Sequence, residues 1–284
     1  MSILQEIIAR VRTDLETTKQ RMPQSVLRPH AANAPAPPDF AAAIGPTAPA
    51  DRPLVIAELK RASPSKGLIR RDFGVVSLAR ELATNGAAAL SVLTEVRYFQ
   101  GGPEFLRAAA ANVTIPILRK DFIVDEYQLY EARAWGASAV LLIAAALTPT
   151  QFQELHERGR DLGLDVLAEA HNREELDMVL DGGAKIVGVN SRDLKTFDVD
   201  LNRTEALLAE IPDGVIRVAE SGIHEPEDLT RLQRAGAHAF LIGETLMRAP
   251  RPGRELARLL QRPAHPKGPA TVLRPLASSL GILL

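Results

Sequence analysis

Eight short apolar runs, separated by longer segments with helical spacing, constrain the fold of this chain most strongly. The runs are rich in β-branched residues, which favour strands, and the segments between them repeat apolar residues at the spacing of amphipathic helices. The runs are LVIAELK, AALSVL, IPILRK, SAVLLIA, LDVLAE, AKIVGVN, GVIRVAE and HAFLIG. The strand ends that they predict are Lys60, Thr94, Lys120, Ala144, Glu169, Asn190, Glu220 and Gly243.

This regular alternation predicts an α/β protein with a closed parallel barrel, the (β/α)8 TIM barrel. Glycines follow many of the predicted helices and support their boundaries, because glycine readily ends a helix. They are Gly86, Gly136, Gly163, Gly182 and Gly236. The alternative is an open doubly wound sheet. Such a sheet seldom has eight strands, and no GxGxxG motif follows the first run.

Two terminal segments flank the predicted barrel, which we place at residues 54–262. Residues 1–53 begin with an amphipathic helix, which precedes strand one, and continue as an Ala- and Pro-rich stretch. Proline resists helix and sheet interiors, so this stretch is interpreted as a surface connector, interrupted by a short helical turn at Phe40–Ile44. The C-terminal tail, residues 263–284, includes LASSLGILL, which could cover an apolar patch, join subunits or be disordered.

Composition limits the partners of the protein. The chain has 34 basic and 35 acidic residues, and its net charge of -1 gives no electrostatic reason to expect nucleic acid or an anionic membrane. The longest apolar run, Ala139–Leu147, is far shorter than the ~20 residues of a membrane span. Acidic residues interrupt the first segment, unlike a signal peptide. We therefore predict a cytoplasmic protein that binds neither nucleic acid nor a membrane.

The residue types present also limit the chemistry. The chain contains no cysteine, which excludes disulfides, thiolate nucleophiles and cysteine-ligated metals. Its six histidines, which include His156, His171 and His224, do not show the paired spacing of metal ligands. We therefore predict no metal ion.

Charged or amide side chains end several of the otherwise apolar strands. They are Glu58, Lys60, Lys120, Glu169, Asn190 and Glu220. The C-terminal ends of barrel strands meet at one mouth, where active sites lie, so we expect these side chains to converge there. Because strand side chains alternate, Glu58 and Lys60 share a face with Ile56, and Lys120 shares one with Leu118. One such charge is usually a solvated loop residue, but five strands that end this way indicate a site for acid and base.

Glycines follow the last two predicted strands, in AESGIHEPED and LIGETL. Each lies at a turn before a predicted helix, where backbone N–H groups can face an anion. TIM-barrel enzymes commonly bind phosphate at these two loops. Glycine serves any tight strand-to-helix turn, so the pairs SG and IG alone are weak signals, and it is their location that favours a phosphate site.

Taken in order, these motifs resemble those of indole-3-glycerol-phosphate synthases. The matching stretches are AELKRASPSKG, SVLTE with YFQGG, PILRKDFIVDEYQLYEARAWGA, LLIAAAL, LAEAH, GVNSRDLKTF, VAESGI and LIGETLM, from about Leu54 to Arg248. The first helix is similar to the extra helix that this family carries before its barrel. The resemblance implies a cofactor-free carbon–carbon lyase of tryptophan biosynthesis. Such an enzyme closes the indole ring of 1-(2-carboxyphenylamino)-1-deoxyribulose 5-phosphate with loss of CO2 and water.

The resemblance also implies roles for individual residues. Lys120 would be the general acid at the carbonyl oxygen of the substrate, and Glu169 its partner carboxylate in dehydration. Glu58 and Lys60 resemble the other catalytic pair of the family. The substrate-binding residues would be Ser63 and Phe122 at the anthranilate part, and Asn190, Arg192, Glu220 and Ser221 at the ribulose chain and carboxylate. The phosphate-binding residues would be Lys60, Ser221, Gly222, Gly243 and Glu244.

Some positions depart from the family pattern, and two other readings stay open. Ser191 stands where the family more often has asparagine, and Ala168 and Ala170 flank Glu169 where it has valine; none of these removes a charge.

The alternative functions are a Schiff-base aldolase, because two strands end in lysine, and an inactive barrel that serves as a binding partner. Phosphoribosylanthranilate isomerase, another barrel of the pathway, uses a cysteine that is absent here. We expect a monomer or weak homo-oligomer.

Overall fold

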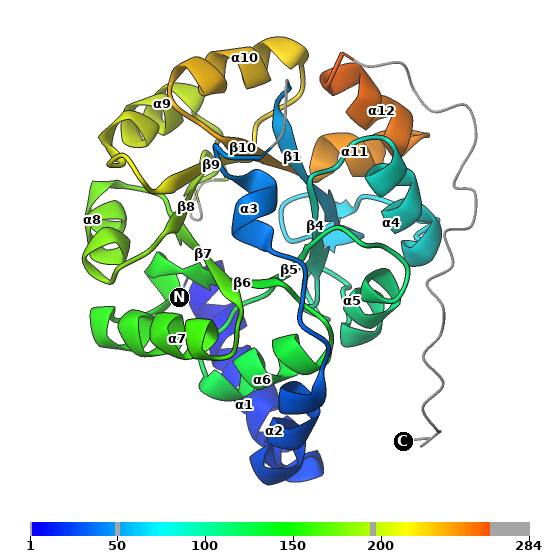
Figure 1. The fold of residues 1–284 in the computed structure, drawn as a ribbon, viewed down its shortest axis with the longest axis vertical. Helices are drawn as coiled ribbons and strands as arrows, with labels where there is room; N and C mark the ends of the chain where they lie inside the picture. The colour runs from blue at the N-terminus through cyan, green and yellow to red at the C-terminus, as the bar shows by residue number, and fades with distance from the viewer. Residues whose placement is uncertain (1, 49–51, 194–196, 262–284) are drawn as a thin grey trace.

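The computed structural model of the chain describes residues 2–48, 52–193 and 197–261. Within these ranges eight parallel strands close into a barrel that is surrounded by helices (Figure 1). The strands are β1 (Leu54–Leu59), β4 (Ala89–Leu93), β5 (Ile117–Lys120), β6 (Ala139–Ile143), β7 (Asp165–Ala170), β8 (Ile186–Asn190), β9 (Ile216–Glu220) and β10 (Ala239–Ile242). Strand β1 pairs with both β4 and β10, which closes the barrel. The prediction of a (β/α)8 barrel is confirmed, and each strand ends within one residue of its predicted end.

Helices connect consecutive strands and cover the outer face of the sheet. They are α4 (Val75–Thr84), α5 (Pro103–Ala110), α6 (Glu126–Ala134), α7 (Pro149–Asp161), α8 (Arg173–Asp181), α9 (Leu201–Glu210), α10 (Pro226–Arg234), α11 (Glu244–Arg248) and α12 (Pro252–Leu259), with a short 3-10 helix, η1 (Ala144–Ala146), after β6. Gly182 caps α8 with a φ of -73°, and the next residue, Gly183, takes the left-handed conformation instead. The helix therefore ends at Asp181, two residues before its left-handed glycine.

Strand side chains alternate between two cores. Val55, Ala57 and Leu59 of β1 point outward into the large core between the sheet and the helices. Ile56 and Leu118 point inward into the smaller core that fills the barrel. The inward rows continue to the C-terminal mouth, so the predicted faces of the strand-end lysines and carboxylates are correct.

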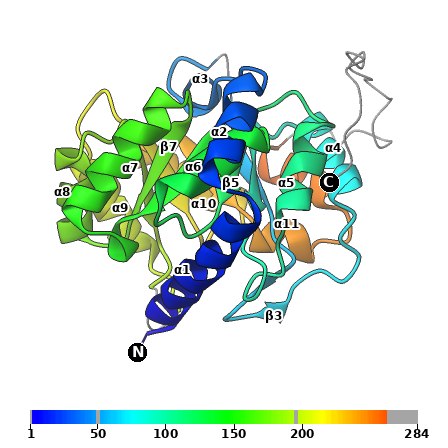
Figure 2. The ribbon, with the colours of Figure 1, turned by 90° about the horizontal axis from the view of Figure 1, so that it is seen from below.

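In the described part of the chain before β1 there are three helices, and two of them lie at opposite ends of the barrel (Figure 2). Helix α1 (Ile3–Arg21) lies at the C-terminal mouth of the barrel, where residues at its start line a pocket. Helix α3 (Phe40–Ile44) closes the N-terminal end of the barrel. The side chains at both ends of α3, Phe40 and Ile44, are fully buried in the barrel core. The carboxylate of Asp165 at the start of β7 accepts a hydrogen bond from the backbone of α3. The predicted helical turn at Phe40–Ile44 is confirmed.

Helix α2 (Gln24–Asn33) was not predicted, and it includes part of the stretch interpreted as a connector. Its residues Leu27 and Ala31 are buried against Tyr127 and Tyr130 of α6. Packing onto α6 therefore stabilises a helix whose internal proline made it an unlikely candidate from sequence alone.

The remaining sequence predictions concern the ends of the chain. The tail at 263–284 lies outside the described residues. Within the described ranges, no helix combines the length and apolar character needed to cross a membrane.

Two short strands lie outside the barrel, in the loop after β1. They are β2 (Ala62–Ser63) and β3 (Gly67–Leu68), and they pair with each other to form a small hairpin.

Candidate active site

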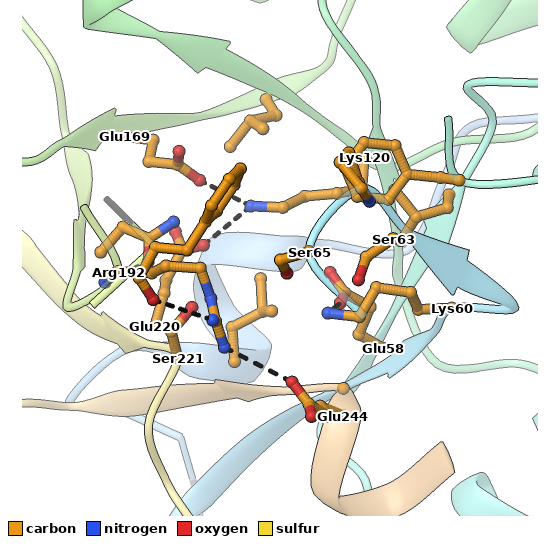
Figure 3. Close-up of a pocket in the computed structure, with 18 of the residues that line it drawn as sticks. Glu58, Lys60, Ser63, Ser65, Lys120, Glu169, Arg192, Glu220, Ser221 and Glu244 are labelled. Carbon is orange, nitrogen blue, oxygen red and sulfur yellow. Dashed lines mark hydrogen bonds and ion pairs between the residues drawn. The ribbon is translucent and has the colours of Figure 1, made fainter. Parts of the chain in front are cut away.

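The C-terminal ends of the strands surround a pocket of about 160 Å³, part of which Figure 3 shows. The structure brings together in its wall all the residues that the sequence assigned to catalysis and binding. They are Glu58, Lys60, Ser63, Lys120, Phe122, Glu169, Asn190, Arg192, Glu220, Ser221, Gly222, Gly243 and Glu244. Their convergence was predicted from the positions of strand ends, and their individual roles stay predictions.

The ammonium group of Lys120 lies between two buried carboxylates. Its Nζ atom is 2.7 Å from Oε2 of Glu169 and 2.8 Å from Oε2 of Glu220 (Figure 3). Lys120, Glu169 and Glu220 stand on β5, β7 and β9, and Glu58 stands on β1. These are alternate strands of the barrel, as expected for side chains of one barrel layer. The uppermost layer is therefore built from charged groups instead of branched apolar ones.

The two carboxylates beside Lys120 have opposite pKa shifts. Burial raises the pKa of Glu220 to about 8, and the charge of Lys120 offsets only part of this effect. Its Oε1 atom is buried and has no hydrogen-bond partner among the described residues, as suits a neutral acid. Burial also acts to raise the pKa of Glu169, but Lys120 and His171 outweigh it and hold this pKa well below its usual value. At neutral pH the site therefore contains an ionised Glu169 and a protonated Glu220.

Lys120 itself stays charged. Burial acts to lower its pKa, but the three carboxylates of Glu169, Glu220 and Glu58 outweigh that effect and raise it above the usual value. Because the ammonium group is ordered by its partners and only 13% exposed, it offers a fixed positive charge to an oxygen atom in the pocket.

A second ammonium–carboxylate pair lies on another wall of the pocket. The Nζ atom of Lys60, just after β1, is 2.6 Å from Oε1 of Glu58 (Figure 3). Glu58 is almost completely buried, and its other oxygen is 3.5 Å from the hydroxyl of Ser91 on β4. The pocket therefore holds two separate ammonium groups, each paired with a carboxylate.

The loops after β9 and β10 contribute residues to the pocket wall. Ser221 and Gly222 follow β9 in the left-handed conformation, with φ of 67° and 73°, which is strained for serine. A Cβ atom added at Gly222 would meet the side chain of Val199, and one added at Gly243 would meet the carboxylate of Glu58. Both glycines are therefore required for close packing at this wall, where the sequence predicted a phosphate site.

Arg192 joins the loop after β8 to the start of α11. Its Nη2 atom is 3.4 Å from Oε2 of Glu244, and its Nη1 donates to the carbonyl of Phe197 at 3.2 Å. The side chain of Asn190 accepts a hydrogen bond from the backbone N–H of Arg192. Burial acts to raise the pKa of Glu244, but the hydrogen bond from Arg248 and the nearby cations outweigh it and lower this pKa. Glu244 is thus a carboxylate that orients Arg192, and only its backbone suits contact with a phosphate.

Comparison with known proteins decides the family. The model of the family described as "Indole-3-glycerol phosphate synthase" matches residues 4–259. The chain belongs to the indole-3-glycerol phosphate synthase family. The match includes α1, as the resemblance implied, and extends to the last helix of the barrel.

Relatives with this name cover most of the chain. The indole-3-glycerol phosphate synthase of Dechloromonas aromatica (strain RCB) is 49% identical over 257 residues, which are 90% of this chain and 98% of the relative. That of Koribacter versatilis (strain Ellin345) is 55% identical over 72% of this chain and 79% of its own length. Among solved structures, a mutant tryptophan synthase α-subunit from Pyrococcus furiosus superposes with a TM-score of 0.57 at 17% identity, covering 74% of this chain and 98% of the subunit. That likeness shows the barrel fold alone.

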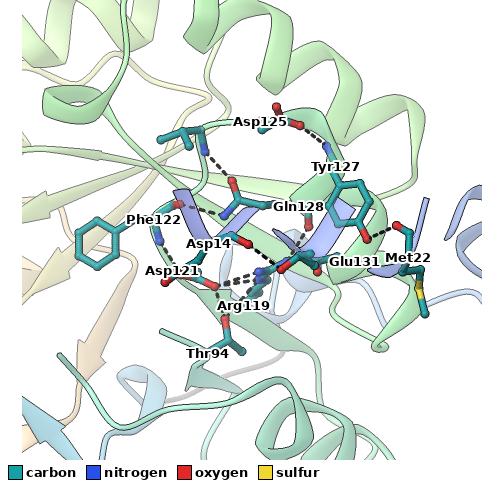
Figure 4. A network of polar contacts seen from close by, with 12 residues as sticks. Asp14, Met22, Thr94, Arg119, Asp121, Phe122, Asp125, Tyr127, Gln128 and Glu131 are labelled. Atoms are coloured by element: carbon teal, nitrogen blue, oxygen red, sulfur yellow. Dashed lines mark hydrogen bonds and ion pairs between the residues drawn. The ribbon is translucent and has the colours of Figure 1, made fainter. Parts of the chain in front are cut away.

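In this member of the family a buried polar network braces the end of β5, where Lys120 lies (Figure 4). Arg119 points away from the pocket and donates to Asp121, Glu131 and the carbonyl of Gln128 at 2.9, 3.2 and 2.7 Å. Asp121 also accepts a hydrogen bond from the backbone N–H of Phe122 at 2.8 Å. The network therefore fixes both neighbours of Lys120, and through Asp121 it also fixes Phe122. The sequence showed the motif LRKDF but did not show that its arginine and aspartate form this buried support.

The sequence analysis also missed apolar residues that line the pocket. Ile3, Leu4 and Ile7 reach it from α1, and Phe99 lies beside Phe122 with ring centroids 6.0 Å apart. The sequence did predict that the first helix has an apolar face, but it does not show which surface that face covers. These side chains give the indole-3-glycerol phosphate synthase site an apolar wall in addition to its charged layer.

Polar contacts hold α1 in this position at the mouth. Asp14 accepts a hydrogen bond from Arg97 at 3.1 Å, and Glu6 accepts one from the hydroxyl of Tyr98 at 2.8 Å. The loop after β4, which carries Arg97 and Tyr98, therefore connects α1 to the barrel of this family member.

Proposed function

We propose that this chain closes the indole ring of 1-(2-carboxyphenylamino)-1-deoxyribulose 5-phosphate, with loss of CO2 and water, to give indole-3-glycerol phosphate. Membership of the family supports this activity. The observation that carries it is the meeting of Lys120, Glu169 and Glu220 in one buried cluster of the pocket. The reaction must give a proton to one atom and remove a proton from another. A charged lysine between an ionised and a protonated carboxyl group supplies both functions.

The walls of the pocket suit the separate parts of the substrate. We assign the phosphate to Lys60 and to the backbone at Ser221–Gly222 and Gly243–Glu244. The apolar wall then faces the aromatic ring, beside Phe122. Cationic and backbone donors hold an anion at one end of the pocket, and the ring is excluded from water at the other.

In the first step, the ring carbon that bears the carboxylate attacks the ketone. The new carbon–carbon bond forms as the π electrons of the ketone move to its oxygen, and Lys120 supplies a proton to that oxygen. Glu220, which is protonated at neutral pH, lies 2.8 Å from Lys120 and returns a proton to it. Loss of CO2 then gives the bonding electron pair back to the ring and restores its aromaticity.

In the second step, the hydroxyl group leaves as water and the adjacent CH2 group loses a proton. Glu169 is the ionised carboxylate of the cluster, so we assign it the removal of this proton. Lys60 with Glu58 forms the second ammonium–carboxylate pair and is assigned to protonate the departing hydroxyl while it holds the phosphate. The two lysines supply the positive charge that a metal ion supplies in other enzymes.

One assay tests the activity. The purified protein is incubated with the substrate in the presence of EDTA, and indole fluorescence and CO2 release are followed together. We expect both products to form at the same rate, and Lys120→Met to abolish most of each. If CO2 release and the indole fluorescence of the product appear only after a divalent ion is added, the proposal is contradicted. Trapping of a carbonyl substrate on a lysine by borohydride would instead favour the Schiff-base aldolase.

We further infer that the protein acts in the cytoplasm as a monomer or weak homo-oligomer, with its phosphorylated substrate as its partner and without nucleic acid. The near-neutral net charge supports the absence of nucleic acid. Size-exclusion chromatography with light scattering over a range of concentrations tests the oligomeric state.

A further inference from the structure

His171 belongs to a buried row of charged side chains that leads from the pocket to the start of α8. Its Nε2 atom is 3.3 Å from Oε1 of Glu169, and its Nδ1 atom is 3.0 Å from Oε2 of Glu175. Only 8% of its side chain is exposed, and it does not contribute to the pocket wall. His171 can therefore influence a bound substrate only through Glu169.

Glu169 has a basic group beside each of its carboxylate oxygens. Lys120 contacts Oε2, and His171 faces Oε1. The charged groups that face the imidazole come from β7 and α8, and they are the carboxylates of Glu169 and Glu175. Burial acts to lower the pKa of His171, but these two carboxylates outweigh it and raise the pKa to about 9. At neutral pH the ring is therefore an imidazolium ion.

The start of α8 fixes the orientation of this ring. Oε2 of Glu175 accepts a hydrogen bond from the backbone N–H of His171 at 2.8 Å, in addition to facing Nδ1. Oε1 of Glu175 accepts from the side chain of Asn172, which in turn caps the helix by accepting from the backbone N–H of Glu175. The ring cannot turn away from Glu169 without breaking contacts in this cap.

We propose that His171 is a positioning residue, whose charge 3.3 Å from Oε1 keeps Glu169 ionised while Lys120 passes its proton to the substrate. This role rests on the proposed function of Glu169 as a base. When Lys120 loses its proton, Glu169 loses its shortest charged contact, and burial then favours protonation of the carboxylate. The imidazolium ion remains beside Oε1, so that Glu169 can still accept the proton of the second step.

The variant His171→Gln tests this role, because it keeps hydrogen-bonding groups but removes the charge. We expect kcat to fall by about tenfold or more at pH 7 and KM to change by less than about twofold, since Glu169 acts mainly in the transition state. The acidic limb of the pH profile of kcat should move to higher pH by on the order of one unit, because loss of a neighbouring cation raises the pKa of a carboxyl group.

Two further variants make the test specific. Glu175→Gln keeps His171 but removes one of its two carboxylates, and it should move the acidic limb in the same direction by a smaller amount. His156→Gln is the control, because His156 is also buried but lies on α7, stacked on Phe152. It should leave kcat and the pH profile unchanged. Nitrogen NMR of the wild-type histidines should show the ring of His171 protonated on both nitrogens at pH 7.5.

A neutral His171 ring at pH 7.5 would overturn the role, as would an acidic limb and kcat that do not change in His171→Gln. If His171→Gln does not fold, the Glu175→Gln profile and the NMR titration decide. Glu169→Gln separates this role from the proposed function. An active Glu169→Gln enzyme would show that Glu169 is not the base, whereas an inactive one beside a normal His171→Gln enzyme overturns the role of His171 alone.

Discussion

The Oε1 atom of Glu220 occupies the space beside Gly188 that a side chain at that position would fill. Gly188 lies in the interior of β8, where glycine weakens a strand because it has no side chain to pack. Here the missing side chain leaves room for the protonated carboxyl group next to Lys120. The glycine is thus part of the site, although it bears no functional group.

Gly188→Ala should lower activity through Glu220. The added methyl group would overlap with Oε1 and push the carboxyl group away from Lys120. We expect kcat to fall by about tenfold or more with a small change in KM, since the proton supply is disturbed and phosphate binding is not. Steady-state kinetics with the substrate measure both constants.

Gly163→Ala is the matched control for this change. A Cβ atom there meets no other atom within 4 Å, but the residue has a φ of 70°. It should therefore lose about 1 kcal/mol of stability and keep its kcat. Equal kcat values in the two variants would show that Gly188 has no role in positioning Glu220.

The two strand-end lysines should respond differently to loss of charge. Lys120→Met is nearly isosteric, and it removes a group that acts mainly in the transition state. Its kcat should fall by roughly 10²-fold or more. Lys60→Met should raise KM clearly as well as slow turnover, because Lys60 is also assigned to the phosphate, which is bound in ground and transition states alike. A normal kcat in Lys120→Met, beside a strongly reduced kcat and an unchanged KM in Lys60→Met, would contradict this division.

The two glycines of the predicted phosphate site should also differ. Gly222→Ala strains a left-handed backbone and pushes against Val199, so it should mainly raise KM. Gly243→Ala should displace the carboxylate of Glu58, so it should lower kcat as well. Inorganic phosphate should compete with substrate in the wild type. If phosphate neither competes nor raises the melting temperature, the phosphate lies elsewhere.

Local sequence patterns were sufficient to predict the barrel and the convergence of its strand ends. Both follow from periodicity, since a strand end such as Lys120 needs only its own run to be located. Helix α2 was missed because its stability comes from contact with α6, which lies about one hundred residues further along the chain. The roles of Gly188 and His171 could not be predicted for the same reason. A buried glycine or histidine becomes functional only through the side chain that lies next to it, and no local pattern contains that information.

The raised pKa of Glu220 predicts how folding stability changes with pH. In the unfolded chain this carboxyl group ionises near its usual pKa of 4.5, but in the folded protein it stays protonated up to about pH 8. Its contribution to stability is therefore fully present below pH 4.5 and is lost progressively as the pH rises from 4.5 to about 8, because over this range the unfolded state has released a proton that the folded state retains. Glu220→Gln cannot ionise and does not show this loss.

We therefore expect Glu220→Gln to gain stability relative to the wild type between pH 5 and pH 8.5, by on the order of a few kcal/mol. Urea unfolding of both proteins at each pH measures the difference. His171 titrates in both proteins, so its contribution largely cancels. Glu205→Gln is the control, because a hydrogen bond from Arg231 lowers the pKa of Glu205 and keeps it ionised at both pH values. If the free energy of unfolding of Glu220→Gln, relative to the wild type, rises with pH no more than that of this control, Glu220 ionises normally in the folded protein. It then cannot return a proton to Lys120.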